Sequence, residues 1–97
     1  KDGGKWGAPH TLDIPLVFGT LEAPGSITGA APDARAVSDA MQDAFIAFAR
    51  TGDPGWAPYT LPRRQTMIFD ASPRMEDDPR GAERELFARV PYIQPGT

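Results

Sequence analysis

The stretch from Pro32 to Arg50 constrains the fold most, because its apolar stripe needs a partner that the rest of the chain scarcely provides. Apolar residues recur there at steps of three and four, which predicts an amphipathic helix. The stripe comprises Val37, Met41, Ala44, Phe45 and Phe48. Pro32 suits a first helical turn, and Gly52 followed by Pro54 predicts the end of the helix. We therefore expect one long helix here, whose Met and Phe stripe packs into a core.

The other expected elements are short. The segment "TLDIPLVFG" at 11–19 fits a buried strand or a single helical turn equally well. Residues 66–69 have the β-branched and aromatic content of a strand. After a polar turn, Asp78 is expected to cap a last helix, with Pro79 at its first position. One face of that helix is expected to hold Leu86, Phe87 and Val90.

These elements do not add up to a self-sufficient domain. A single strand cannot form a sheet, and even a two-stranded ribbon is marginal. Long connections rich in proline and glycine also fit poorly in a small autonomous fold. We therefore expect residues 1–97 to form the end of a larger domain, with the main sheet upstream and absent from this segment. The alternative is an autonomous small α+β domain.

Charge and composition exclude several classes of partner. The formal net charge is −3, and Arg63 with Arg64 is the one adjacent basic pair, so no nucleic-acid partner is expected. The chain has no cysteine and one histidine, so we expect no metal and no other cofactor. No apolar run approaches the roughly 20 residues that cross a bilayer, so no membrane span is expected. Nothing in the sequence specifies the compartment.

His10 is the one histidine, and a histidine that acts as a general base needs a nucleophile or a carboxylate within hydrogen-bond reach. None of the serines at positions 26, 38 and 72 lies in a G-x-S-x-G nucleophile elbow. The chain therefore cannot contain a complete triad of the α/β-hydrolase type. That fold places the histidine last in chain order, so a C-terminal piece would carry the histidine alone.

Three segments stand in order along the chain: "GAPHTLDIPLVFG", "SDAMQDAFIAFARTGDP" and "WAPYTLPRRQTMIFD". Together they resemble the C-terminal part of the type B carboxylesterases, the family that includes para-nitrobenzyl esterases and cholinesterases. The resemblance implies an α/β-hydrolase fold, a small-molecule carboxylic ester as substrate and His10 as the catalytic histidine. In that role His10 would take the proton of the serine nucleophile and return it to the leaving alcohol. The serine, its acidic partner and the oxyanion donors would lie before Lys1, in the missing N-terminal part of the domain.

The neighbours of His10 also gain expected roles. The family places an acidic residue three positions after the histidine, and Asp13 is expected to fix the loop there and not to serve as the triad acid. In the family a glycine often follows the histidine, and here Thr11 stands in its place. The entry to the substrate pocket and its shape near His10 are therefore expected to differ. Gly7 and Pro9 favour a sharp, low-entropy approach to His10. Trp6, Leu12 and Phe18 have two open roles, contact with substrate and core or loop packing, and packing is the expected one.

The resemblance thus predicts part of a serine carboxylic-ester hydrolase that acts through an acyl-enzyme. By itself the chain is expected to be inactive. The alternative function is a non-catalytic cholinesterase-like binding module, since the same fold serves for adhesion when triad members are lost. We also expect the isolated chain to be poorly stable or self-associating, because its long helix would expose apolar side chains. Those side chains are Val37, Met41, Phe45 and Phe48.

Overall fold

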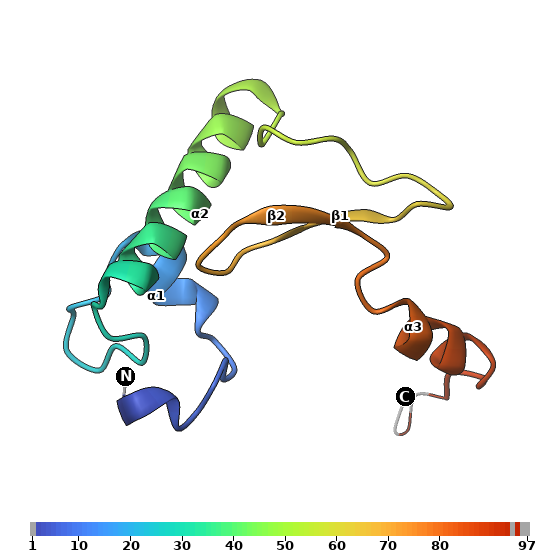
Figure 1. Ribbon diagram of the computed structural model, residues 1–97, viewed down its shortest axis with the longest axis horizontal. Helices are drawn as coiled ribbons and strands as arrows, with labels where there is room; N and C mark the ends of the chain where they lie inside the picture. The colour runs from blue at the N-terminus through green and yellow to red at the C-terminus, as the bar shows by residue number, and fades with distance from the viewer. Residues whose placement is uncertain (1, 94, 96–97) are drawn as a thin grey trace.

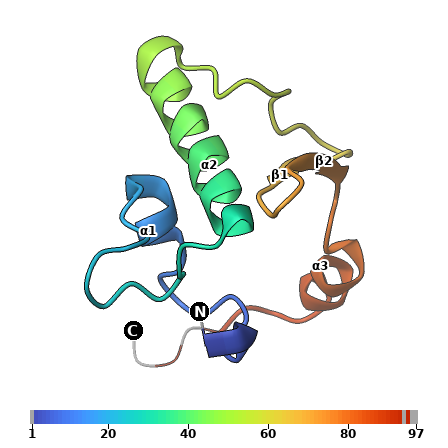
Figure 2. The same cartoon turned by 60° about the vertical axis from the view of Figure 1, so that its left-hand side comes forward.

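The computed structural model describes residues 2–93 and 95. Its elements are, in chain order, a 3-10 helix Asp2–Gly4, α1 Asp13–Phe18, α2 Pro32–Thr51, β1 Gln65–Ile68, β2 Arg74–Asp77 and α3 Gly81–Ala88. Figure 1 shows α1 packed beside the first half of α2, with the strand pair beyond this helix pair and α3 at the far end. The turned view in Figure 2 shows the same separation of α3 from the two packed helices.

The long helix α2 confirms the helix predicted from Pro32 and is one residue longer at its end. Pro32 occupies the first turn, where its missing N–H would have had no helical acceptor. Gly52 ends the helix with a left-handed φ of 79°, and its N–H donates to the Phe48 carbonyl over 2.7 Å. A glycine is suited to this position because a Cβ disfavours the left-handed conformation.

The segment that fitted a strand or a helical turn equally well is helix α1. Pro15 lies in its first turn, where a residue without an N–H loses no helical hydrogen bond. Gly19 closes the helix with a φ of 67°, and its N–H donates to the Leu16 carbonyl. The same proline would have interrupted a strand, so the helical choice follows from local chemistry.

The predicted strand at 66–69 is β1, shifted by one residue, and it pairs antiparallel with β2 in the register Gln65↔Asp77 and Ile68↔Arg74. The sequence analysis assigned the region of β2 to a polar turn, and this assignment was wrong. β2 is mostly exposed and reads Arg-Met-Glu-Asp, so it lacks the apolar alternation that marks a half-buried strand. Within the described residues the two strands form a two-stranded ribbon.

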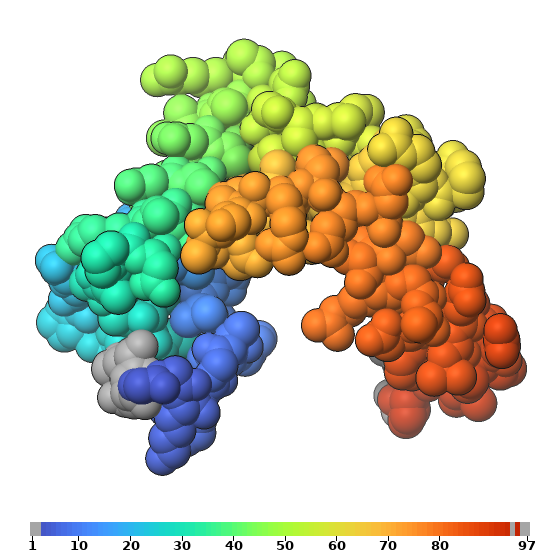
Figure 3. All heavy atoms as spheres, viewed as in Figure 1, coloured from blue at the N-terminus to red at the C-terminus, as the bar shows by residue number. Residues whose placement is uncertain are grey.

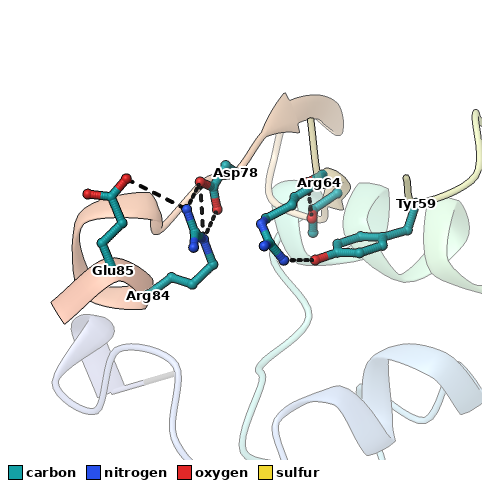
Figure 4. A network of polar contacts seen from close by, with 6 residues as sticks. Tyr59, Arg64, Asp78, Arg84 and Glu85 are labelled. Carbon is teal, nitrogen blue, oxygen red and sulfur yellow. Dashed lines mark hydrogen bonds and ion pairs between the residues drawn. The ribbon is translucent and has the colours of Figure 1, made fainter. Parts of the chain in front are cut away.

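The last helix was predicted in kind but not in its start. Asp78 is not the N-cap: α3 begins at Gly81 with Arg80 in the capping position, and Pro79 precedes it. Asp78 has a φ of 46°, and its carboxylate accepts hydrogen bonds from Arg84 Nε and one terminal nitrogen at 3.0 and 2.9 Å. Figure 4 shows this ion pair. The carboxylate lies beside Gly81 at the start of α3, but it is bonded to Arg84.

Arg64, the residue before β1, links the ribbon to the chain segments next to it. Arg64 donates a hydrogen bond to the Tyr59 hydroxyl over 2.9 Å, as Figure 4 also shows. The Arg64 carbonyl accepts from the Asp78 N–H at 3.2 Å. Leu86 and Phe87 of α3 are exposed. Val90, expected on the same helical face, lies beyond the end of α3 and is also exposed, so that part of the prediction was wrong.

The chain forms an open arch with very little core. Figure 3 shows the N-terminal residues and α3 on either side of a wide opening. The Cα radius of gyration is 16.3 Å, whereas a compact domain of this length has about 13 Å. Among the described residues, Leu21 and Ala44 are the buried apolar side chains, at 4% and 8% exposure.

The apolar stripe of α2 is only partly covered. Phe45 and Phe48 are exposed, which confirms that part of the expectation for the long helix. Val37 and Met41 are half-buried, so the prediction that they would be exposed was wrong. Val37 lines a cavity together with Leu16 of α1, and this packing accounts for its cover.

Candidate functional site

His10 lies at the second position of a reverse turn. The Leu12 N–H donates to the Pro9 carbonyl over 3.2 Å and closes this turn. Gly7 precedes it with a φ of 59°, and its N–H donates to the Gly4 carbonyl over 3.0 Å, so two successive turns lead up to His10. The imidazole is exposed. The prediction of a sharp approach through Gly7 and Pro9 is therefore confirmed.

Thr11 follows His10 with a φ of 69°, and His10 is not among the described residues with positive φ. A positive φ at the third of four turn positions alone is the pattern of a type II turn, which favours glycine or asparagine there. A β-branched residue in this conformation is a backbone outlier. Thr11 therefore places a β-branched side chain in a backbone conformation that favours glycine.

The turn runs directly into α1. The Ile14 N–H donates to the Thr11 carbonyl over 3.2 Å, so the first helical turn begins where the His10 turn ends. Asp13 is the first residue of α1, and its exposed carboxylate lies at the positive end of the helix dipole. Over residues 2–93 and 95, this carboxylate has no side-chain hydrogen bond. Its charge can stabilise the helix start, but no hydrogen bond from it fixes the loop.

A polar contact joins the far end of α1 to α2. The Ser38 hydroxyl donates to the Leu16 carbonyl over 2.6 Å, and Gln42 Nε2 donates to the Ser38 hydroxyl over 3.0 Å. Gly19 lies so close to Gln42 that a Cβ there would approach its Oε1 to 2.9 Å. The segment that carries His10 is thus bonded to α2 through the Ser38 hydroxyl and the Leu16 carbonyl, and Gln42 supports that hydroxyl from within α2.

The apolar neighbours of His10 divide into two groups. Leu12 is half-buried and lines a cavity with Leu16, Val37 and Phe69, so its expected packing role is confirmed. Trp6 borders the same cavity but remains exposed, and Lys5 Nζ lies 4.9 Å from its ring centroid.

Phe18 is 73% exposed beside an apolar groove between α1 and α2. Neither Trp6 nor Phe18 is buried within the described part of this chain, so the packing role expected of them stays a prediction for the complete domain.

The shifted carboxylates of the chain belong to surface ion pairs away from His10. The hydrogen bond from Arg84 holds the pKa of Asp78 below its usual value, and Arg74 lowers the pKa of Asp70 in the same way. The Arg74–Asp70 pair lies at the connection between β1 and β2, and the Arg84–Asp78 pair joins the end of β2 to α3. Over residues 2–93 and 95, no three His, Asp or Glu side chains gather as a metal site would require. In the same range, none of the helices combines the length and apolarity needed to cross a membrane.

Comparison with known proteins decides the family. No family model matches the chain. Para-nitrobenzyl esterase from Bacillus subtilis strain 168 is 34% identical over 86 residues, which cover 78% of this chain and 17% of that esterase. Carboxylesterase EST55 from Geobacillus stearothermophilus matches in structure with a TM-score of 0.70 and 39% identity, over 80% of this chain and 18% of that one. This chain belongs to the type B carboxylesterases.

Two further relatives agree. A solved structure of PNB esterase gives a TM-score of 0.69 at 32% identity over 78% of the chain, and human bile salt-activated lipase is 44% identical over 66 residues. The resemblance predicted from the three ordered segments is thereby confirmed. The chain spans less than one fifth of the length of these carboxylesterase relatives.

Ser38 has a structural role in this carboxylesterase segment that was not predicted from the sequence. The lack of a G-x-S-x-G elbow excludes Ser38 as the nucleophile but gives no information on its packing. A signal was present, however, because Ser38 precedes Met41 by three and Phe45 by seven positions and so lies in the apolar stripe of the long helix. A hydroxyl in such a stripe indicates a buried hydrogen bond to another element.

Proposed function

We propose that these 97 residues form the C-terminal part of an α/β-hydrolase domain in a serine carboxylic-ester hydrolase, and that His10 is its catalytic histidine. The main support is the likeness to carboxylesterases in both sequence and backbone over about four fifths of the chain. The open arch with two buried apolar side chains among the described residues supports the view that a sheet from the rest of the domain covers this segment.

The local structure suits His10 for proton transfer. A general base must be held accurately, and His10 is on a hydrogen-bonded turn that continues into a helix. Its imidazole is exposed, so it is accessible to a serine and a carboxylate from elsewhere in the protein. The sequence contains no G-x-S-x-G nucleophile elbow, so the serine that His10 serves is expected in another part of the protein.

The proposed reaction proceeds in two stages. His10 accepts the serine proton as the serine oxygen bonds to the ester carbonyl carbon, and it then donates that proton to the departing alkoxide. An acyl-enzyme and a free alcohol result. His10 next accepts a proton from water as the water oxygen attacks the acyl carbon, and it returns that proton to the serine as the carboxylic acid leaves. The serine, the acid and the oxyanion donors belong to the part of the protein outside these residues.

The proposal is tested on the complete protein that carries this segment, with a para-nitrophenyl ester as substrate. We expect hydrolysis by the unsubstituted protein and a fall in kcat of at least about 1000-fold in His10→Ala. Asp39→Ala, on the exposed side of α2, is the matched control and should retain the activity. Equal activity of His10→Ala and the control would exclude His10 as the catalytic base.

A second measurement uses the isolated chain. It should not hydrolyse the ester above the background rate, because the nucleophile is absent from it. Hydrolysis by the isolated chain that disappears in His10→Ala would overturn the proposed division of the triad.

A further inference from the structure

Ser38 is the most buried side chain of the described residues, with 2% of its surface exposed. A serine is an unusual residue to bury most deeply, since a hydroxyl loses its hydration and needs a partner. The partner here is the Leu16 carbonyl in the last turn of α1, at 2.6 Å. The centre of the α1–α2 contact is therefore a directional hydrogen bond and not an apolar side chain.

Gln42 extends this contact by one helical turn. Its Nε2 donates to the Ser38 hydroxyl at 3.0 Å, and its Oε1 lies where a Cβ on Gly19 would come to 2.9 Å. We call Ser38 and Gln42, with the Leu16 carbonyl and Gly19, the α1–α2 clasp. It fixes both the distance and the rotation of α1 relative to α2, because a hydrogen bond to a carbonyl requires a particular direction as well as a length.

The rest of α1 gives little specific support. It has no buried residue, and both Ile14 and Phe18 are largely exposed. A helix of six residues is also too short to be stable without tertiary contacts. In this part of the chain α1 is therefore held by the α1–α2 clasp together with partial apolar packing, such as that of Leu16 and Val37, which line the same cavity.

Movement of α1 would be transmitted to His10. The Ile14 N–H is bonded to the Thr11 carbonyl and the Leu12 N–H to the Pro9 carbonyl, so the turn and the helix share residues without an intervening flexible link. Thr11 narrows the freedom further, because its left-handed φ of 69° lies in a small allowed region for a β-branched residue. A displacement of α1 would therefore be passed to the His10 turn, because few backbone dihedrals between them are free to absorb it.

We propose that Ser38 and Gln42 are positioning residues for His10, acting through the α1–α2 clasp on the turn that carries the imidazole. The proposal rests on the proposed function, since it assumes that His10 transfers protons. Misplacement of a catalytic group by about 1 Å can lower a rate by about 100-fold, which sets the scale of the expected effect.

The test compares Ser38→Ala with Thr51→Ala in the complete protein. The Thr51 hydroxyl donates to the Ala47 carbonyl over 2.9 Å on the same helix, but at an exposed position at the helix end. Each variant thus removes a hydroxyl-to-carbonyl bond made by α2. Thr51→Ala also removes the two bonds between that hydroxyl and the Asp53 backbone, at 3.3 and 3.1 Å, so the control loses no fewer hydrogen bonds than Ser38→Ala. We expect Ser38→Ala to lower kcat by about 10- to 100-fold with KM within about twofold, and Thr51→Ala to change neither. Ser38→Thr, which keeps the hydroxyl, should recover part of the loss.

Active sites are counted in each variant by complete labelling with a fluorophosphonate, so that kcat refers to folded enzyme. A merely structural role would reduce the number of labelled sites and leave kcat per site unchanged. That result, or equal kcat per site in Ser38→Ala and Thr51→Ala, would overturn the positioning role while His10→Ala remained inactive. Retained activity in His10→Ala would instead refute the proposed function, so the two failures are distinguishable.

Discussion

Replacing Phe18 and Phe45 together by serine is expected to weaken self-association of the isolated chain. Both side chains border the apolar groove between α1 and α2, and they are 73% and 57% exposed. Full burial of a phenylalanine side chain contributes about 1.5–3 kcal/mol, so these exposed parts correspond together to about 2–4 kcal/mol of unused burial. An unoptimised contact between copies recovers only part of this. With half recovered, the double substitution weakens association by about 10-fold.

Sedimentation velocity over a range of concentrations measures the effect. The unsubstituted chain should show a rising average mass with concentration, and the double variant should shift this rise to about 10-fold higher concentration. Ala36→Ser is the matched control, because it adds a serine on the opposite side of α2 at an exposed position. A compact monomer of the unsubstituted chain at every concentration would refute the reasoning that the groove lacks its natural cover.

Two further predictions concern single contacts. The hydrogen bond from Arg84 lowers the pKa of Asp78 in the folded chain. The pair therefore stabilises the attachment of α3 fully at a pH above the usual Asp pKa. This stabilisation is lost as the pH falls through the lowered pKa of the folded state. The rate of proteolysis at the ribbon–α3 junction should therefore increase at acid pH, and Arg84→Gln should remove this increase. The same dependence of the rate on pH in Arg84→Gln as in the unsubstituted chain would contradict the role of the pair. An alanine in the left-handed conformation costs about 1–2 kcal/mol of folding free energy. Gly19→Ala should destabilise the complete protein by more than this, because the added Cβ would also meet the Gln42 side chain. Gly25→Ala, at a φ of 84° with open space around it, isolates the backbone part, and equal losses of thermal stability in the two variants would exclude the contact.

Features of the fold that depend on local chemistry were predictable from the sequence. The proline at the start of α2 and the glycine after it marked its limits to within one residue. The His10 turn was also predictable in outline, since Gly7 and Pro9 restrict the chain on its approach. Both features are encoded by residues within a few positions of where they act.

Features that depend on distant partners were not predictable. β2 carries three charged residues in four and becomes a strand only because β1 pairs with it. Asp78 had the residue type of a helix cap, but Arg84 six positions later holds its carboxylate. The acceptor of the Ser38 hydroxyl was not predictable for the same reason, because it lies 22 residues earlier in the chain.

That separation also has a consequence for the time course of synthesis. The residues of α1 leave the ribosome before α2, and the end of α2 follows about 30 residues later. At a synthesis rate of about 5–20 residues per second, about 2 to 6 seconds pass between the synthesis of α1 and the completion of α2. During that interval a six-residue helix cannot persist alone. The histidine turn is therefore translated early but acquires its fixed shape late, and slow codons between the two helices would lengthen the period in which it is exposed and unformed.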